Sequence, residues 1–270
     1  MKCAVLGDPI AHSLSPTLHR AGYAALGLDW TYKARRVEAG GLADFLVGLD
    51  DDWRGLSLTM PLKREAIALA ENVSDRARLA GAANTLVLGP EGVAADNTDI
   101  PGAAAAIRER YSGPVSVATI LGGGATATST GLALCDLGAT EIRLLVRSPE
   151  RAAETVEAIR RHSTAPSVII GSLTSDFAEG DVVVSTIPAS AQDNALVGRC
   201  SEVPVVFEVL YNPWPTPLAR AALASGRVLV GGLDLLVHQA ALQFALFTGE
   251  PAPLESMRTA GEVELAARSQ

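Results

Sequence analysis

The sequence predicts a two-domain α/β fold, with an N-terminal α/β domain built on a mostly parallel sheet and a second, Rossmann-like domain. Short β-branched apolar runs alternate with longer helical segments along the chain. One such run, residues 115–121, leads directly into a cluster of glycines. At 270 residues, with 48% hydrophobic and 19% charged residues, the chain can bury a core in each of two domains.

The first hundred residues alternate as expected for one α/β unit. Strands are predicted at 2–6, 31–37, 55–58 and 84–88, and helices at 41–49 and 63–72. A further helix is predicted to begin at Pro16, with Ser15 as its N-cap. The segment from Gly89 to Gly92 closes the last strand. This order favours a largely parallel sheet.

The rest of the chain continues the alternation. After a helix that opens at 100–102, strands are predicted at 115–121, 142–146, 167–170, 182–185 and 205–209, and helices at 125–137, 233–247 and 254–268. Polar residues within 228–247, Gln239 and Gln243 among them, favour a strand followed by a helix over a membrane span. We expect a substrate-binding and catalytic domain at 1–100, a nucleotide-binding domain at 101–232, and C-terminal helices at 233–270 that return to the first domain.

Composition excludes several classes of function. A net charge of −8 without a basic cluster argues against a nucleic-acid partner. The 3 cysteines lie far apart in apolar contexts, and the 4 histidines have no metal-ligand spacing, so we expect reduced core cysteines and no metal. No signal peptide precedes the first strand, which favours a cytoplasmic protein with no membrane attachment.

The glycine cluster has the spacing of a dinucleotide-binding turn. Gly122, Gly124 and Ala127 match the G-x-G-x-x-G/A pattern. In that pattern the first glycine permits the tight turn, the second lets backbone N–H groups approach a pyrophosphate, and Ala127 lets the next helix pack closely on the strand. The helix N-terminus adds partial positive charge for the phosphates. Glycine-rich turns also occur without a ligand, but the preceding strand and the following helix favour a cofactor site.

The end of the next predicted strand distinguishes NADP from NAD. An acidic residue there binds the ribose 2′-hydroxyl of NAD, whereas a basic residue accommodates the 2′-phosphate of NADP. Arg147 and Arg151 can clamp that phosphate, and the Ser148 hydroxyl can add a hydrogen bond. Glu150 is the one nearby acid, and it points away if Pro149 begins a helix. The alternative is that both arginines only solvate a helix start; we favour NADP.

Two residues of the first half are candidates for the proton transfer that accompanies hydride transfer. Lys63 follows Pro61, which is predicted to open a helix, and a lysine in a first helical turn is electrostatically unfavourable unless a carboxylate or a chemical role compensates. Asp99 is the candidate carboxylate, and a helix N-cap is an equal alternative for it. Ser13 and Ser15 are placed to bind a carboxylate at a helix N-terminus, with simple capping by Ser15 as the alternative.

Taken together, these segments resemble the shikimate dehydrogenase family over nearly the whole chain. The family motifs occur in order: S-x-S-P at 13–16, T-x-P-x-K at 59–63, G-A-x-N-T at 81–85, D-N-T-D at 96–99, the glycine loop at 122–125, the N-R-T-x-x-R/K segment at 146–151, Y-N-P-x-x-T-P-L at 211–218 and Q-A-A at 239–241.

The resemblance implies reversible NADPH-dependent reduction of 3-dehydroshikimate to shikimate, with Lys63 and Asp99 as the proton-transfer pair. It assigns the substrate carboxylate to Ser13 and Ser15, with assistance from Tyr211, and the ring hydroxyls to Thr59, Asn84, Asp99 and Gln239. The predicted cofactor site comprises Gly122, Gly123, Gly124, Ala125, Thr126, Arg147, Ser148, Arg151, Thr186, Val209 and Gly232. The partner is then a small molecule, and the assembly a monomer or homodimer.

The chain departs from the family pattern at five positions and leaves two alternatives open. Ser57 and Val146 replace asparagines, Ile100 and Asp234 replace glycines, and Leu235 replaces a methionine. One alternative is an NAD-using quinate/shikimate dehydrogenase, which the lack of an acid directly after strand 142–146 disfavours. The other is a catalytically silent, nucleotide-sensing regulator on the same scaffold, which the presence of both Lys63 and Asp99 disfavours.

Overall fold

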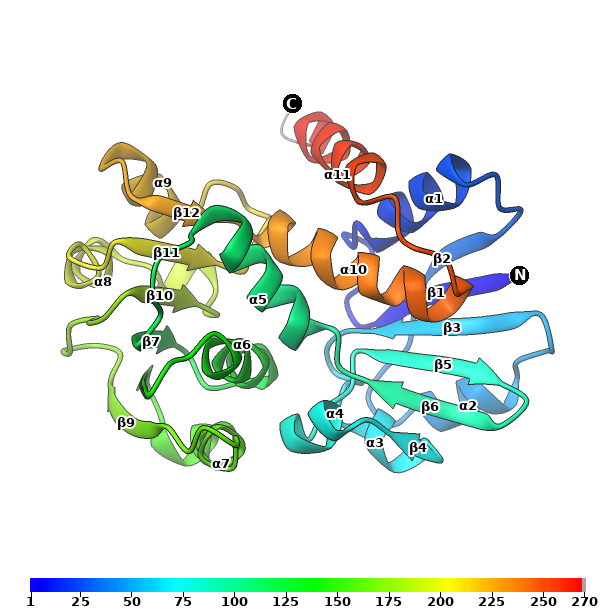
Figure 1. Ribbon diagram of the computed structural model, residues 1–270, viewed down its shortest axis with the longest axis horizontal. Helices are drawn as coiled ribbons and strands as arrows, with labels where there is room; N and C mark the ends of the chain where they lie inside the picture. The colour runs from blue at the N-terminus through cyan, green and yellow to red at the C-terminus, as the bar shows by residue number, and fades with distance from the viewer. Residues whose placement is uncertain (269–270) are drawn as a thin grey trace. The chain divides into compact units, whose positions relative to one another are not determined.

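The computed structural model describes residues 1–268, which form two compact units. Unit 1 comprises residues 1–98 together with the described residues from 236 onward, and unit 2 comprises residues 99–235. Each unit contains its own six-stranded sheet (Figure 1). Helix α10, Gly232–Thr248, begins in unit 2 and continues into unit 1. The predicted α/β class, with a mostly parallel sheet in the first domain and a Rossmann-like second domain, is confirmed.

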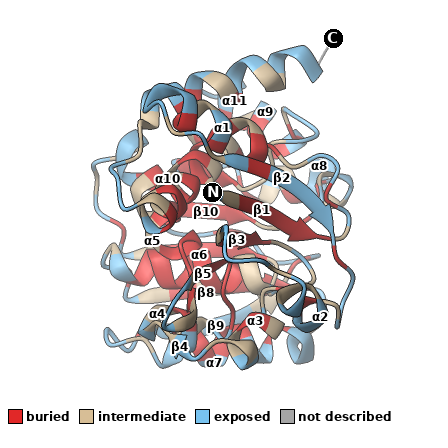
Figure 2. Cartoon of the chain, turned by 90° about the vertical axis from the view of Figure 1, so that its right-hand side faces the viewer, coloured by how far each residue is buried: buried red, intermediate tan, exposed pale blue. Residues whose placement is uncertain are grey.

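The sheet of unit 1 has the strand order β2-β1-β3-β5-β6-β4. Its strands are β1 Lys2–Gly7, β2 Thr31–Arg36, β3 Trp53–Leu58, β4 Asn72–Val73, β5 Thr85–Gly89 and β6 Gly92–Asp96. Only β5 runs against its neighbours: it pairs antiparallel with β3 and β6, whereas the other pairings are parallel. β1 and β3 are largely buried, while the edge strand β2 is mostly exposed (Figure 2).

Helices surround this sheet and complete the core of unit 1. They are α1 Ser15–Ala25, α2 Leu42–Val47, α3 Glu65–Leu69, α4 Asp75–Ala80, α10 and α11 Leu254–Arg268. One cluster of buried side chains, with Leu6, Leu56 and Leu86 from the strands and Leu42 from α2, fills one face of the sheet. Burial of these apolar side chains is the main stabilising term of such a core.

The sheet of unit 2 is fully parallel and has the strand order β12-β11-β10-β7-β8-β9. Its strands are β7 Val117–Leu121, β8 Glu141–Val146, β9 Ser167–Ser172, β10 Val182–Ser185, β11 Val205–Glu208 and β12 Val228–Val230. Its helices are α5 Asp99–Arg110, α6 Ala125–Asp136, α7 Ala153–Arg160, α8 Asn194–Arg199 and α9 Pro217–Ala224, with 3₁₀ turns at Pro149–Ala152 and Ala189–Ala191. The strand order reverses between β7 and β10, and ligands bind at such a switch point in open α/β sheets.

The structure adds elements that the sequence analysis did not predict. β6 forms an antiparallel hairpin with β5, where only a closing turn was expected after β5. β6 has the sequence G-V-A-A-D, which contains few strongly apolar residues and so gives a weak strand pattern. It forms a strand because it pairs with β5 and β4. The short elements α4 and β4 were also not predicted.

The predicted start of α1 is wrong by one residue. Ser15 is the first helical residue, and Leu14, which occupies the N-cap position, makes no side-chain capping hydrogen bond. The Ser13 hydroxyl oxygen instead accepts the backbone N–H of Ser15 at 3.3 Å. This hydrogen bond partners one of the N–H groups that a helix start leaves without an intrahelical acceptor.

The described residues also bear on the cysteines and on membrane spanning. Cys3, Cys135 and Cys200 are buried and not disulfide-bonded, as predicted. Burial raises the pKa of Cys3 and Cys200 to about 11 and that of Cys135 to about 12, so their thiols stay protonated at neutral pH. Within residues 1–268, no helix is both long enough and apolar enough to cross a bilayer.

Candidate active site

Thr59 and Asn84, two of the residues assigned to substrate, lie at one edge of the unit 1 sheet. β1 and β3 are parallel and end together, at Gly7 and Leu58. β5 begins at this edge because Thr85 pairs with Ser57, and β6 ends there because Asp96 pairs with Thr85. Thr59, Asn84 and the turn that follows β6 therefore share one edge of the sheet. Such an edge, at the carboxyl ends of parallel strands, is where open α/β sheets bind ligands.

Lys63 lies in a turn and not in a helix, which corrects the prediction that Pro61 opens one. α3 begins only at Glu65, and Arg64 is its N-cap residue. The N–H of Leu62 donates to Thr59 O at 2.9 Å, and the carbonyl of Lys63 accepts the N–H of Ala83 at 2.7 Å. The second bond draws this carbonyl to the segment before Asn84, which keeps Lys63 outside the helix. Lys63 therefore does not lie in a first helical turn, and its charge is not opposed there by a helix dipole.

Asn84 is the centre of a buried amide cluster and is 2% exposed. Its Nδ2 donates to Thr98 Oγ1 at 2.9 Å and to Gln239 Oε1 at 3.3 Å. Its Oδ1 accepts the N–H of Thr98 at 2.8 Å and the hydroxyl of Thr85 at 2.8 Å. The structure thus brings the side chains of Asn84 and Gln239 into hydrogen-bond contact.

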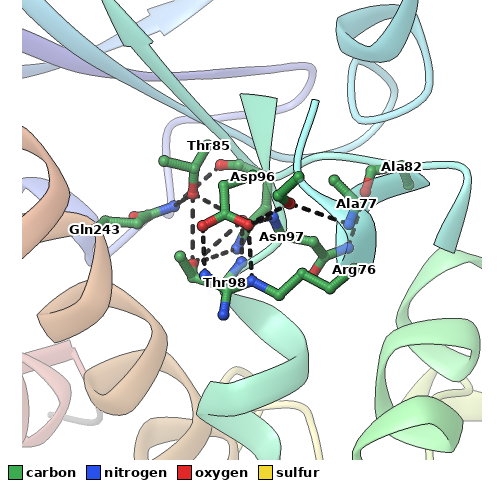
Figure 3. A network of polar contacts seen from close by, with 10 residues as sticks. Arg76, Ala77, Ala82, Thr85, Asp96, Asn97, Thr98 and Gln243 are labelled. Carbon is green, nitrogen blue, oxygen red and sulfur yellow. Dashed lines mark hydrogen bonds and ion pairs between the residues drawn. The ribbon is translucent and has the colours of Figure 1, made fainter. Parts of the chain in front are cut away.

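The turn between β6 and α5 is held by Asp96, as Figure 3 shows. Asp96 Oδ1 accepts from Arg76 Nε at 2.7 Å, Ser74 Oγ at 2.6 Å and the N–H of Asn97 at 2.8 Å. Asn97 Nδ2 donates to the carbonyl of Ala82 at 2.9 Å. Burial raises the pKa of Asp96, but the hydrogen bonds from Arg76 and Ser74 outweigh it and leave the pKa below its ordinary value.

Asp99 directly follows this turn and is the first residue of α5. It is 8% exposed, and a carboxylate in a first helical turn is favoured by the helix dipole. Lys63 belongs to unit 1, and Asp99 begins unit 2.

In unit 2, the predicted cofactor residues follow the carboxyl ends of parallel strands. The glycine loop follows β7, Arg147 and Ser148 follow β8, Thr186 follows β10, Val209 follows β11, and Gly232 comes shortly after β12. A pocket of about 250 Å³ is lined by residues of three of these segments, among them Gly122, Gly123, Gly124, Arg147, Arg151 and Thr186. Val209 and Gly232 do not line it. Gly232 is packed against backbone, since a Cβ there would lie 2.5 Å from the carbonyl oxygen of Val209.

Each glycine of the loop has a distinct environment. Gly122 has φ +110°, and a Cβ on it would lie 2.5 Å from Thr186 Oγ1. A Cβ on Gly123 would lie 2.6 Å from Cβ of Ala152. A Cβ on Gly124 would have nothing within 4 Å. The first two glycines are therefore required by the protein itself, whereas Gly124 faces open space at the start of α6, where a pyrophosphate group would fit.

The part of the pocket that follows β8 contains two arginines and a serine that is hydrogen-bonded to a neighbouring glutamate. Arg147 and Arg151 line the pocket together with Ser148. The Ser148 hydroxyl donates to Glu150 Oε2 at 2.8 Å, so its proton is directed at a carboxylate. Glu150 thus lies beside Ser148, which corrects the expectation that it points away. The residues that fit a 2′-phosphate are chiefly the two arginines.

Further polar residues, not predicted from the sequence, hold these loops in place. Thr155 Oγ1 donates to the carbonyl of Gly123 at 2.9 Å and lies 2.8 Å from Thr128 Oγ1. Glu208, at the end of β11, accepts from Gln192 Nε2 at 2.7 Å and Thr216 Oγ1 at 2.8 Å. Burial raises the pKa of Glu208 despite these donors. For Glu208, a charged residue at the end of an otherwise apolar strand was the available signal. Thr155 lies in a helix rich in charged residues, which gave no such signal.

Comparison with known proteins identifies the family. The model of the shikimate dehydrogenase substrate binding domain matches residues 5–86, and that of the shikimate 5′-dehydrogenase C-terminal domain matches residues 232–260. A shikimate dehydrogenase (NADP(+)) of Methanosarcina mazei is 35% identical over 94% of this chain and 95% of its own length. One of Desulfitobacterium hafniense is 32% identical over 95% of this chain and 96% of its own. The chain belongs to the shikimate dehydrogenase family.

Solved structures of the shikimate dehydrogenase family share the whole fold. The shikimate dehydrogenase of Mycobacterium tuberculosis is 40% identical, with a TM-score of 0.89 over 97% of this chain and 99% of that one. A shikimate 5-dehydrogenase of Thermus thermophilus, solved in complex with NADP(H) and shikimate, is 29% identical, with a TM-score of 0.83 over 97% and 99% of the two chains.

The departures from the shikimate dehydrogenase pattern are accommodated by local contacts. Asp234 accepts from Arg110 Nη2 at 2.8 Å and from the N–H of Gly231 at 2.9 Å, which partners one N–H at the start of α10. Ile100, Val146 and Leu235 are buried apolar side chains. Ser57 is 3% exposed and is hydrogen-bonded to Tyr32 and Gln243.

Proposed function

We propose that this protein catalyses the reversible, NADPH-dependent reduction of 3-dehydroshikimate to shikimate. The observation that carries the proposal is its 32–35% identity, over at least 94% of the chain, to proteins named shikimate dehydrogenase (NADP(+)). The chemistry of the two sites supports it. Unit 1 has neutral amides and hydroxyls at one sheet edge, and unit 2 has a glycine loop flanked by arginines.

On the substrate side, Thr59, Asn84, Asp99 and Gln239 would bind the ring hydroxyls. Ser13 and Ser15 would hold the carboxylate at the start of α1, with Tyr211 assisting. A site built from buried hydrogen-bonding groups discriminates strongly, because an analogue that lacks one hydroxyl leaves a buried polar group without a partner. Asn84 already bonds to Gln239 and Thr98, so these two amides are oriented before a ligand arrives.

On the cofactor side, the residues present fit a dinucleotide phosphate. The N–H groups of Gly123, Gly124, Ala125 and Thr126 would face the pyrophosphate, and Arg147 and Arg151 would hold the 2′-phosphate. Thr186, Val209 and Gly232 would border the remainder of the cofactor. NADPH supplies the hydride when it is bound.

The proton that accompanies the hydride is assigned to Lys63 and Asp99. The ammonium of Lys63 would donate a proton to the substrate oxygen in the direction of reduction and accept it back in the reverse direction. Asp99 would orient the same hydroxyl and stabilise the charged lysine. We further propose that the protein acts in the cytoplasm, as a monomer or a homodimer.

The direct test measures NADPH formation by purified protein with shikimate, with NADP⁺ and NAD⁺ compared side by side and quinate as the control substrate. Rapid turnover confined to shikimate and NADP⁺ is the expected result. Comparable turnover with quinate and NAD⁺ would instead favour a quinate/shikimate dehydrogenase. Binding of NADPH without turnover of either substrate would contradict the enzymatic proposal and favour a nucleotide-sensing regulator.

A further inference from the structure

The side-chain amide of Gln243 in α10 makes three hydrogen bonds within unit 1. Its Oε1 accepts the hydroxyl of Ser57 at 2.7 Å. Its Nε2 donates to the carbonyl of Asn84 at 3.0 Å and to Thr85 Oγ1 at 3.0 Å. Gln243 is 1% exposed, and these three hydrogen bonds all join it to protein groups. Figure 3 shows its amide directed at Thr85.

These three hydrogen bonds join the segments that carry the proposed hydroxyl-binding residues. Ser57 lies near the end of β3, two positions before Thr59. The carbonyl of Asn84 also accepts the N–H of Leu58 at 2.7 Å, so both of its lone pairs are used. Gln239 lies one helical turn before Gln243 and on the same face of α10. One side chain therefore links the segments of Thr59 and Asn84 to the helix that presents Gln239.

The chemistry requires an amide at this position. Among the side chains, only a primary amide combines an acceptor oxygen with two donor N–H groups on one planar end. The network extends further, because Tyr32 donates its hydroxyl to Ser57 Oγ at 2.5 Å. Ser57, Thr85 and Gln243 are all buried, and a satisfied network of this kind holds its members in one arrangement.

We infer that Gln243 is a positioning residue for substrate recognition: it fixes the Asn84 backbone and the register of α10, and thereby the spacing of the Asn84, Gln239 and Thr59 side chains. The inference rests on the proposed function, which gives those three side chains their role. Gln243 acts through them and does not touch the substrate. Its loss lowers substrate affinity and leaves the cofactor site of unit 2 unchanged.

The test is steady-state kinetics of Gln243→Met, which keeps side-chain length and removes all three hydrogen bonds. We expect the KM for shikimate to rise by about tenfold or more, because small displacements of binding groups have effects of this order, with kcat changed far less. The KM for NADP⁺ should stay within about twofold. In an Asn84→Ala background, Gln243→Met should add little to the KM for shikimate, because coupled residues are not additive.

Phe244→Leu is the matched control, because Phe244 is the neighbouring buried residue of α10 and packs against Tyr23 with ring centroids 5.4 Å apart. It should lower Tm without raising the KM for shikimate. An equal rise in KM in both variants, or full additivity with Asn84→Ala, would overturn the inference. Ser57→Ala, which removes a single hydrogen bond to Gln243, gives a milder second variant if Gln243→Met does not fold. Wild-type protein without shikimate turnover would overturn the proposed function and the inference together.

Discussion

Arg76 and Asp96 form a two-point ion pair at the turn that leads into Asp99. Arg76 Nε lies 2.7 Å from Asp96 Oδ1, and Arg76 Nη2 bonds to Asp96 Oδ2. The Asp96 side chain is 13% exposed and that of Arg76 is 41% exposed. Because Asp96 also accepts the N–H of Asn97, the pair fixes the conformation of the chain just before the proposed catalytic aspartate.

We expect Arg76→Met to lower the free energy of unfolding by about 0.5–1 kcal/mol, a value reduced for the exposure of the guanidinium. Arg78→Met is the control, since exposed Arg78 on the same helix donates to the carbonyl of Val73. Urea unfolding at pH 7 measures both changes. Equal losses in the two variants would show that the ion pair adds nothing to stability.

The same contact predicts a pH dependence of stability. The pKa of Asp96 in the folded protein lies below its ordinary value, so its contribution is present above the unfolded pKa of about 3.9. That contribution is lost as the pH falls through the folded pKa. The difference in unfolding free energy between wild type and Asp96→Asn should therefore be constant from pH 7 to about pH 5 and shrink at lower pH. A difference that stays constant down to pH 2.5 would contradict the assigned shift.

Lys63→Ala should lower kcat for shikimate oxidation by about 100-fold or more, as expected for loss of a general acid–base group. The cofactor affinity should change little, because Lys63 belongs to unit 1 and the glycine-loop pocket to unit 2. Lys33→Ala, which removes an exposed lysine of β2, is the matched control. Turnover near the wild-type rate in Lys63→Ala would remove this residue from the mechanism.

The fold and most loop positions could be predicted from the sequence because the strands and helices have regular apolar patterns. The run before Gly122 and the long helices near the C-terminus have clear apolar patterns, and the structure places them as expected. The turn at Lys63 was predicted as helix, because local propensity cannot show that its carbonyl pairs with the distant Ala83. The role of Gln243 likewise depends on contacts between segments far apart in the sequence, which no local pattern contains.

Arg147→Ala should weaken binding of NADPH by at least about tenfold more than binding of NADH, since a charge-assisted contact to a 2′-phosphate is lost only with NADPH. Fluorescence titration of both cofactors measures the two dissociation constants. Arg161→Ala serves as the control, because Arg161 is exposed just beyond α7 and pairs with Glu157 at 3.7 Å. Equal weakening of both cofactors by Arg147→Ala would exclude a 2′-phosphate contact.

Gly124→Ala should affect NADPH binding more than the stability of the fold. Gly124 has φ −93° and ψ −171°, which alanine adopts without strain, and a Cβ there meets no protein atom within 4 Å. Stability should therefore fall by at most about 1 kcal/mol, the usual effect of a poorer N-cap residue. NADPH binding should weaken by about tenfold or more, because the added methyl group lies where backbone N–H groups approach the pyrophosphate.

Thermal unfolding and NADPH titration of three variants test this prediction together. Gly198→Ala, on an exposed helix position with nothing within 4 Å, should leave NADPH affinity unchanged and raise Tm slightly, because alanine is favoured over glycine within a helix. Gly123→Ala should lower Tm as well as affinity, because its Cβ would lie 2.6 Å from that of Ala152. Wild-type NADPH affinity in Gly124→Ala would mean that the pyrophosphate does not approach this turn, and the cofactor would have to bind unit 2 elsewhere.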